Sequence, residues 1–332
     1  MIPVGMVLVF VAVVLVVYLA TLDGGYKVDR SIVIEVAPQQ VFDRVRDLRS
    51  WKDWSPWLIH EPDTTLEFSE HPDQEGGWYR WDGRVVGAGK LTHGRFEVPS
   101  MIDQQIEFIR PFRSVVAVGW RFQPCDEGTR VHWQMTGRMP FLFRFMAAGT
   151  RAMIEKDYDL GLAMLRGVLD PQAEVPRLTF AGETVLSPWH SLAYDWSGSL
   201  DDMPAVMQQQ FPLLGSEIEQ QGRAQIGPAF TAFHSVDQER QQVQCSMAIV
   251  VDSEASAGRM ALKDLGGGRY FKVSVQGSYS FLGLAWYAAN SHLRMHKFKR
   301  DRSRPSLEVY ENDPRAVTSS NELLTTLYLP LK

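Results

Sequence analysis

The C-terminal part of the chain repeats itself at an offset of 79 residues, because Gly198 and Gly277 occupy matching positions and 277 − 198 = 79. Around these glycines, Trp196-Ser197-Gly198-Ser199-Leu200 is echoed by Val275-Gln276-Gly277-Ser278-Tyr279. Apolar positions match at the same offset without a gap, in the pairs Phe230 and Val309, Met203 and Leu282, Leu214 and Leu293, and Ile249 and Tyr328. Strand, turn and helix signals that recur together at one offset indicate a duplicated structural unit.

Each copy has the pattern of a strand, a Gly-Ser turn, an amphipathic helix and two further strands. The expected elements are strand 191–196, helix 201–221 and strands 230–235 and 243–251 in the first copy, and strand 271–275, helix 281–297 and strands 307–311 and 323–329 in the second. Two βαββ copies about a pseudo-twofold axis form a groove between them. We therefore predict one duplicated domain over residues 183–332, with repeats at about 183–252 and 262–331, behind a polar linker at 171–182.

Residues 27–170 have the pattern of a separate folded domain. Ser31 to Val36 alternates as a strand, and Ala37-Pro38 opens a helix. Strand-like runs follow between Gly, Pro and Asp signals, at 65–68, 77–81, 85–91, 102–108, 115–122 and 129–136, and a helix with one apolar stripe covers 142–169. This order predicts an α+β domain in which an antiparallel sheet curves around a long C-terminal helix and encloses a cavity. We expect Trp51, Trp54 and Trp57 to pack in its core rather than to form a ligand cage.

The N-terminal segment contains no charged side chain between Met1 and Leu22. As a helix it spans about 33 Å, which is enough for a hydrocarbon core of about 30 Å. A cleaved signal peptide is disfavoured because a basic n-region is absent and Tyr18 occupies the outer position of Tyr18-Leu19-Ala20. We therefore predict a single-pass transmembrane helix at residues 1–22, in contact with membrane lipid. Lys27 and Arg30 follow the span, which favours a cytoplasmic body.

The charge balance argues against a dedicated nucleic-acid binder, because the 332-residue chain has a net charge of −5. One basic run, from His296 to Arg304, is expected to be a solvated helix end and loop, or else a contact for anionic lipid headgroups. The histidines of the first domain lack the spacing of metal ligands and occur at His60, His71, His93 and His132. We predict no metal site, no cofactor and no nucleic-acid partner.

The last two predicted strands form a hairpin around the turn residues Asn312-Asp313-Pro314. Leu307 and Val309 share one face of the first strand, which looks core-facing, whereas Glu308 and Tyr310 share the other face. Glu308 either points to water or lines a pocket in which a carboxylate receives a cation or a polar ligand. The first copy has Ala229 at the matching position, since 308 − 79 = 229. A pocket there would have a single anionic group.

The first domain resembles the START-like, or SRPBCC, superfamily of helix-grip ligand binders. The likeness is carried by Arg30-Ser31-Ile32, Ala37 to Phe42, Trp51 to Trp57, Thr129 to Trp133 and Asp157 to Ala163. This resemblance implies a cavity for apolar or amphipathic small molecules, and some members of the superfamily catalyse cyclisation or hydrolysis. It supplies no catalytic set on this chain.

The duplicated domain resembles the GyrI-like effector-binding domain found in multidrug-sensing regulators. The likeness is carried by Leu307 to Pro314, by Asn321 to Pro330, and by Gly277-Ser278-Tyr279 with Leu282 and Trp286. The resemblance implies that Glu308 faces a central groove and meets cationic or polar ligands among aromatic side chains, for which Trp286 and Tyr310 are candidates. Direct transcriptional regulation is disfavoured, since no helix-turn-helix precedes the repeat.

These features together predict a membrane-tethered protein that binds small hydrophobic or cationic molecules in a helix-grip cavity and in a groove anchored by Glu308. A small-molecule hydrolase is the alternative, with Glu308 as general base and Tyr310 assisting it on the same face of the strand. A third possibility, which the resemblance alone suggests, is a protein-interaction module in stress response.

Overall fold

The protein divides into two compact units, one reaching to Ala173 and the other covering Glu174–Lys332. The computed structural model describes residues 4–170, 172–222, 225–252 and 260–332. Each unit contains its own sheet together with helices, so the predicted mixed α+β class is confirmed.

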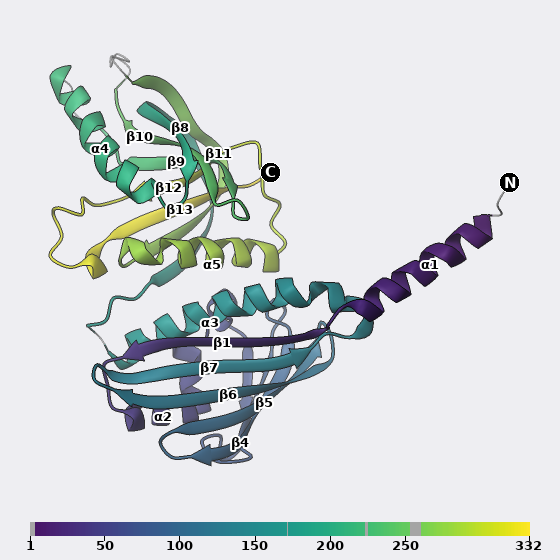
Figure 1. The fold of residues 1–332 in the computed structure, drawn as a ribbon. Helices are drawn as coiled ribbons and strands as arrows, with labels where there is room; N and C mark the ends of the chain where they lie inside the picture. The colour runs from purple at the N-terminus through teal and green to yellow at the C-terminus, as the bar shows by residue number, and fades with distance from the viewer. Residues whose placement is uncertain (1–3, 171, 223–224, 253–259) are drawn as a thin grey trace. The chain divides into compact units, whose positions relative to one another are not determined.

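The first unit is a seven-stranded antiparallel sheet in the order β1-β7-β6-β5-β4-β3-β2. Its long closing helix α3 runs alongside β1 (Figure 1). The elements are α1 (Val4–Thr21), β1 (Gly25–Ile34), α2 (Pro38–Arg46), the 3-10 turns η1 (Leu48–Asp53) and η2 (Leu58–His60), β2 (Thr65–Phe68), β3 (Trp78–Asp82), β4 (Ala88–Glu97), β5 (Met101–Arg110), β6 (Ser114–Cys125), β7 (Gly128–Arg138), η3 (Phe141–Met146) and α3 (Ala147–Leu169).

Large aromatic side chains fill the space between this sheet and its helices. The indoles of Trp120 and Trp133 are stacked with centroids 4.4 Å apart, and Trp133 stacks on Tyr158 of α3 at 3.8 Å. Trp51 and Trp54 meet Trp120 edge to face and are 2% and 0% exposed, so the expected core role of these two residues is confirmed. Aromatic rings therefore occupy the interior where an apolar cavity was predicted.

A hollow of about 610 Å³ does occur in this unit, but the aromatic core does not line it. Its walls come from the start of β1, from β6 and from the end of β7, and include Lys27, Val115 and Arg138. These three side chains are exposed. The hollow is therefore a surface feature and does not replace the predicted interior cavity.

Gly161 of α3 marks how tightly the aromatic core is packed. A Cβ at this position would lie 2.8 Å from Cζ3 of Trp133 and 3.0 Å from Cδ of Pro56. We expect Gly161→Ala to lower the free energy of unfolding by about 1–3 kcal/mol, because overpacking outweighs the gain in helix propensity. The measurement is urea unfolding of the full chain.

Gly149 of the same helix is the matched control, since no atom lies within 4 Å of a Cβ built there. Gly149→Ala is expected to raise the free energy of unfolding by about 0.4–1 kcal/mol. Equal effects of the two alanine substitutions would contradict the packing argument.

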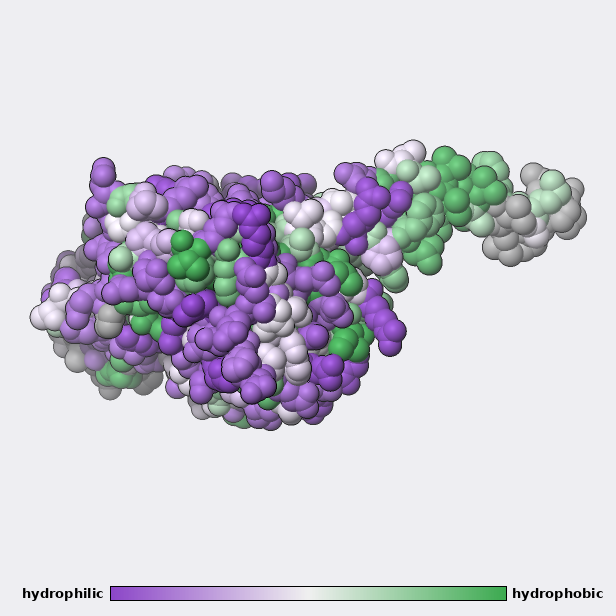
Figure 2. All heavy atoms as spheres, turned by 90° about the horizontal axis from the view of Figure 1, so that it is seen from below, coloured by the Kyte–Doolittle hydropathy of each residue, from purple (hydrophilic) through white to green (hydrophobic). Residues whose placement is uncertain are grey.

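Helix α1 corrects one prediction from the sequence. It has 18 residues, about 27 Å at 1.5 Å per residue, which is less than a hydrocarbon core of about 30 Å. Apart from the buried Leu19, most of its apolar side chains, such as Met6 and Phe10, are exposed. The helix appears as a green segment in Figure 2. Among the described residues, no helix combines the length and apolar character that a bilayer crossing needs. The single-pass anchor expected at residues 1–22, and the membrane localisation built on it, are therefore wrong; residues 1–3 lie outside the described part.

The second unit is a closed six-stranded barrel in the order β10-β8-β11-β13-β12-β9. Figure 1 shows the helices α4 and α5 beside its strands. The elements are β8 (Arg177–Ser199), α4 (Met203–Gln220), β9 (Ala229–Asp237), β10 (Gln242–Val250), β11 (Ala261–Gln276), η4 (Tyr279–Phe281), α5 (Leu282–Met295), β12 (Ser306–Tyr310), η5 (Ser320–Glu322) and β13 (Leu324–Pro330).

The strand register agrees with the sequence repeat at the centre of the barrel. Phe230 of β9 pairs with Val309 of β12, and 309 − 230 = 79, so a twofold axis would map this pair onto itself. The last strand departs from the gapless repeat. Leu192 pairs with Ile249, whereas its counterpart Phe271 (192 + 79) pairs with Leu329. By this ladder Ile249 matches Leu329. By the ladder on its other side it matches Leu327, because Ala229 pairs with Ile249 and its counterpart Glu308 pairs with Leu327. Neither ladder matches Ile249 with Tyr328, so the two copies differ in register at this strand.

The first strand of each copy is longer than the sequence predicts. β8 begins at Arg177, inside the range expected to be a linker, and it pairs with β11 as far as Ala261. None of the residues from Arg177 to His190 is buried, but exposed and partly buried residues alternate along this half of β8, and Leu178 and Phe180 pack against the apolar core beside α5. In β11, Gly266-Gly267-Gly268 continues the strand with φ between +83° and +93°, a conformation open to glycine.

Candidate functional site

In β12, the side chains of Leu307 and Val309 point into the barrel, whereas those of Glu308 and Tyr310 point away from it. Leu307 and Val309 are 0% and 1% exposed and pack in the barrel interior with Phe230 and Tyr270. Glu308 lies on the opposite face, which is the face covered by the helices. The alternation expected for this strand is therefore present.

The structure brings the three predicted site residues into contact. Glu308 is 3% exposed, and its Oε2 accepts a hydrogen bond of 2.6 Å from Nε1 of Trp286 on α5. Its Oε1 accepts a hydrogen bond of 2.7 Å from the hydroxyl of Tyr310. The Tyr310 hydroxyl also lies 3.0 Å from Oγ1 of Thr231, the residue that pairs with Glu308 across β9 and β12. Glu308 thus links Trp286 on one side to Tyr310 and Thr231 on the other in a short hydrogen-bonded chain.

Burial dominates the acid–base properties of this chain. Desolvation raises the pKa of Glu308, and the hydrogen bonds from Trp286 and Tyr310 oppose this shift only in part. Desolvation, together with the nearby carboxylate of Glu308, raises the pKa of Tyr310 well above its ordinary value. Tyr310 therefore remains a protonated phenol, and burial shifts Glu308 toward its neutral carboxylic acid.

The hydroxyl groups satisfy Glu308 in either protonation state. When Glu308 is ionised, Tyr310 donates to Oε1 and can accept from Thr231, since either hydroxyl of that pair can be the donor. When Glu308 is neutral, its own O–H can donate to Tyr310, which then donates to Thr231. Trp286 donates to Oε2 in both cases. Neither state leaves a buried polar atom of these four residues without a partner.

Aromatic side chains that the sequence reading missed surround these four residues. Phe233 of β9 lies 5.7 Å from the ring of Trp286, while Phe211 of α4 and Tyr279 of η4 lie 5.5 and 5.7 Å from the ring of Tyr310. All three are partly exposed. Phe211 belongs to the other copy of the repeat, so only the assembled domain places it here. Tyr279 belongs to the Gly277-Ser278-Tyr279 run that carries the family resemblance, but the run alone does not indicate that its side chain lies at this site.

The surroundings of Glu308 are chemically one-sided. The repeat relates Trp286 to Met207 (286 − 79 = 207) and Tyr310 to Thr231 (310 − 79 = 231). Ala229, the counterpart of Glu308, pairs with Tyr310 across the two strands. The duplicated scaffold therefore presents one carboxylate with an aromatic environment on one side of its centre.

Two arginines of the basic run after α5 are bound to the fold. Arg304 donates hydrogen bonds to the carbonyl oxygens of Gly267 (2.7 Å) and Leu331, and to Oδ2 of Asp301 (2.9 Å). Arg300 donates to Ser306 Oγ at 2.8 Å, and burial lowers its pKa. Arg300 and Arg304 are therefore structural, whereas Lys297, Lys299 and Arg302 are exposed, as expected for a solvated helix end and loop.

The histidine at position 93 is a hydrogen-bonded core residue. Its Nε2 lies 2.9 Å from the carbonyl oxygen of Arg46, and its Nδ1 lies 3.2 Å from the side-chain nitrogen of Gln104. Burial lowers the pKa of His93 to about 4. This is the structural role expected for it from the sequence.

The solved structures similar to this chain share little sequence with it. Protein MLL2253 from Mesorhizobium loti is 12% identical, covers 45% of this chain and 99% of its own, and has a TM-score of 0.36. Protein SA2116 of unknown function from Staphylococcus aureus is 13% identical, covers 45% and 96%, and has a TM-score of 0.36. SAV2435, solved bound to tetraphenylphosphonium, is 13% identical, covers 45% and 92%, and has a TM-score of 0.37. At these values the likeness carries no functional conclusion. No curated protein matches the chain.

Family models match each unit separately. Residues 26–170 match the family described as polyketide cyclase / dehydrase and lipid transport. Residues 186–332 match the family described as GyrI-like small molecule binding domain. Both resemblances stated from the sequence are thereby confirmed at the level of the domain. The chain thus matches two family models in succession, polyketide cyclase / dehydrase and lipid transport in its first unit and GyrI-like small molecule binding domain in its second.

Proposed function

We propose that the second unit binds small lipophilic cations, with the carboxylate of Glu308 as the counter-charge. The observation that carries this proposal is a buried carboxyl group that has no basic partner among the described residues and is enclosed by aromatic side chains. Membership in a small-molecule-binding family supports the same conclusion.

The solvation energy of the carboxylate favours such a ligand. An ionised carboxylate out of water is strongly unfavourable unless a positive charge lies beside it. A lipophilic cation supplies that charge, and its apolar surface can pack on the rings of Trp286, Tyr310 and Phe233. A neutral apolar molecule would gain only the packing, because it has no charge to pair with the carboxylate. The site should therefore prefer cations over neutral molecules of the same shape.

Ligand entry requires side chains to move, because Glu308 is only 3% exposed in this structure. Trp286, Tyr279 and Phe211 are partly exposed and belong to α5, η4 and α4 respectively. Rotation of these side chains offers access without a change in the barrel. Breaking the 2.6 Å hydrogen bond from Trp286 is compensated when the cation takes its place beside Oε2.

The test is isothermal titration calorimetry of the full chain with tetraphenylphosphonium, a lipophilic cation, and with triphenylphosphine oxide, a neutral molecule that carries three of the same rings. We expect saturable binding of the cation and at least tenfold weaker binding of the neutral compound, because only the cation pairs with Glu308. Equal affinity for the two compounds, or no binding of the cation, would contradict the proposal.

A hydrolase remains the second candidate because of one contact, the 2.7 Å hydrogen bond between the Tyr310 hydroxyl and Glu308 Oε1. A carboxyl group with a raised pKa beside a phenol is an arrangement that general acid–base catalysis uses. In that case, a cationic substrate incubated with the protein would be converted to product, and the conversion would be lost in Glu308→Gln. Recovery of the cation unchanged would favour binding.

A further inference from the structure

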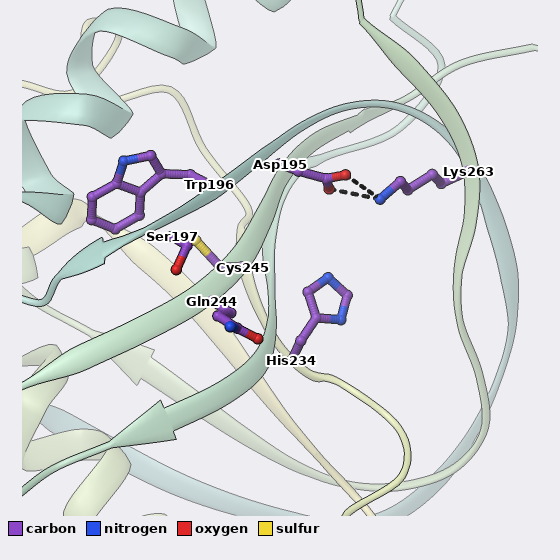
Figure 3. A pocket seen from close by; sticks show the side chains of 7 residues that line it. All are labelled: Asp195, Trp196, Ser197, His234, Gln244, Cys245 and Lys263. Carbon is purple, nitrogen blue, oxygen red and sulfur yellow. Dashed lines mark hydrogen bonds and ion pairs between the residues drawn. The ribbon is translucent and has the colours of Figure 1, made fainter.

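A second polar cluster lies at the barrel, apart from Glu308 and its partners. An open hollow of about 330 Å³ is lined by β8, β9, β10 and β11 through Asp195, Trp196, Ser197, His234, Gln244, Cys245 and Lys263. Figure 3 shows the imidazole of His234 and the ion pair of Asp195 and Lys263 around the same open space. The hollow shares none of the residues that contact the Glu308 carboxyl group.

A β-bulge directs His234 into this hollow. Cys245 of β10 pairs with Phe233 of β9, whereas the preceding Gln244 pairs with Ser235, so His234 is the extra residue of the ladder. A bulge of this kind at the rim of a barrel re-aims a side chain that would otherwise follow the strand alternation. His234 is exposed, and the seryl side chain to which it is hydrogen-bonded, Ser246, is fully buried.

The hydrogen bonds fix the tautomer of His234. Asp195 is ionised, because the hydrogen bonds from Lys263 and Ser246 outweigh desolvation and lower its pKa, and it can therefore only accept hydrogen bonds. Its Oδ1 accepts from Ser246 Oγ at 2.6 Å, so the single hydroxyl proton of Ser246 is directed to Asp195. The contact of 2.8 Å between Ser246 Oγ and Nε2 of His234 must then be donated by Nε2–H. Nδ1 of the neutral ring carries the lone pair.

The surrounding charges keep His234 neutral. Desolvation lowers the pKa of His234, the Lys263 ammonium lowers it further, and Asp195 opposes the two effects in part. Lys263 is held at 2.5 and 2.7 Å from the two oxygens of Asp195. Among the described residues, no group donates a hydrogen bond to Nδ1 of His234. A basic nitrogen of fixed tautomer is thus presented beside an ammonium group.

We propose that this hollow is a hydrolytic site for small neutral esters, in which Nδ1 of His234 acts as general base. A general base needs an imidazole whose orientation is fixed by a hydrogen bond at one ring nitrogen, so that the other nitrogen is free to take a proton. In His234, Ser246 binds Nε2 and Nδ1 carries the lone pair. The proposal is independent of ligand binding at Glu308, since the two sites use different residues.

The step balances without a further reactant. Nδ1 takes a proton from water while the water oxygen forms a bond to the carbonyl carbon of the ester. The carbonyl oxygen becomes an oxyanion, which the ammonium of Lys263 stabilises. When the carbonyl re-forms, the bond to the leaving oxygen breaks, and that oxygen takes the proton from Nδ1. The products are a carboxylic acid and an alcohol or phenol.

The experiment is hydrolysis of p-nitrophenyl acetate by the full chain, measured by the release of p-nitrophenol. We expect His234→Gln to lower kcat/KM at least tenfold, because removal of a general base commonly costs more than that. His71→Gln is the matched control, since the His71 side chain is exposed and its weak contact with Glu70 is 3.9 Å long. This control is expected to keep the wild-type rate within twofold.

The pH profile separates a general base from a residue that only maintains the structure. Activity should depend on the neutral imidazole, so it should be present above the lowered pKa of His234 and lost as the pH falls through it. Lys263→Met removes the ammonium that depresses this pKa, so the acidic limb of the profile should move to higher pH. A wild-type rate in His234→Gln, or an unmoved acidic limb in Lys263→Met, would overturn the proposal.

Discussion

Replacing Glu308 by glutamine is expected to weaken tetraphenylphosphonium binding by at least about thirtyfold, which corresponds to about 2 kcal/mol. The substitution keeps the size of the side chain and removes the charge that pairs with the cation. Because the carboxyl group is 3% exposed, solvent would screen its attraction for a bound cation only weakly. Calorimetric titration of the full-length variant measures the change directly.

The fold should tolerate this substitution, because the hydrogen bonds around position 308 can reverse. The glutamine oxygen can accept from Trp286, and its amide can donate to Tyr310, which then donates to Thr231 in place of accepting. The thermal midpoint of Glu308→Gln should therefore stay at or above that of the wild type, since no carboxyl group has to be desolvated.

Glu311→Gln provides the matched control, because Glu311 lies just past the end of the same strand, is exposed, and undergoes the same change of charge. Its affinity for the cation should stay within twofold of the wild type. An unchanged affinity in Glu308→Gln, or an equal loss in both variants, would contradict a role of Glu308 as the counter-charge.

Cation binding is also expected to depend on pH with a defined sign. Burial raises the pKa of Glu308 above its ordinary value, so the empty site holds a proton over a wider range of pH than an exposed glutamate does. A cation binds to the ionised form and displaces this proton. Below the raised pKa, the affinity should therefore fall about tenfold for each unit by which the pH is lowered, and above it the affinity should level off.

Titrations in buffers that differ in ionisation enthalpy measure the number of protons released. We expect about one proton per cation below the raised pKa and none well above it. In Glu308→Gln, the affinity should not vary with pH in this way. A wild-type affinity that stays constant as the pH is lowered would show that Glu308 is ionised in the empty site.

The sequence predicts which residues share a face of β12, because this signal is local. Leu307, Glu308 and Val309 are consecutive, and the strand period of two separates Glu308 from its apolar neighbours in any sheet. That Glu308 contacts Trp286 follows from the packing of α5 on the strands, which the sequence alone does not determine; the family resemblance supplied it. Phe211 and Thr231 come from the other copy of the repeat, and a residue pattern gives no means of finding them before the strands are paired.

Strand extensions and the β-bulge could not be predicted, because they depend on how the strands pair. The start of β8 follows Pro171 and Pro176, whose loop signals predict a linker there. β11 extends over Gly266 to Gly268, and glycine is depleted in strands, so the sequence gives no signal for this part of the strand. The bulge at His234 becomes visible only when Phe233 and Ser235 have been assigned their partners. At the N-terminus, the apolar composition predicts a membrane span, whereas the described helix has 18 residues.

The stacked tryptophans of the first unit have a spectroscopic consequence. Indoles as close as those of Trp120 and Trp133, with centroids 4.4 Å apart and planes inclined by 20°, couple their electronic transitions. Such coupling gives a paired positive and negative band in circular dichroism that disappears when the rings separate. The tryptophans of the second unit, at 189, 196 and 286, have no tryptophan neighbour among the described ring contacts. The exciton band should therefore report melting of the first unit alone and allow the two units to be followed separately in one sample.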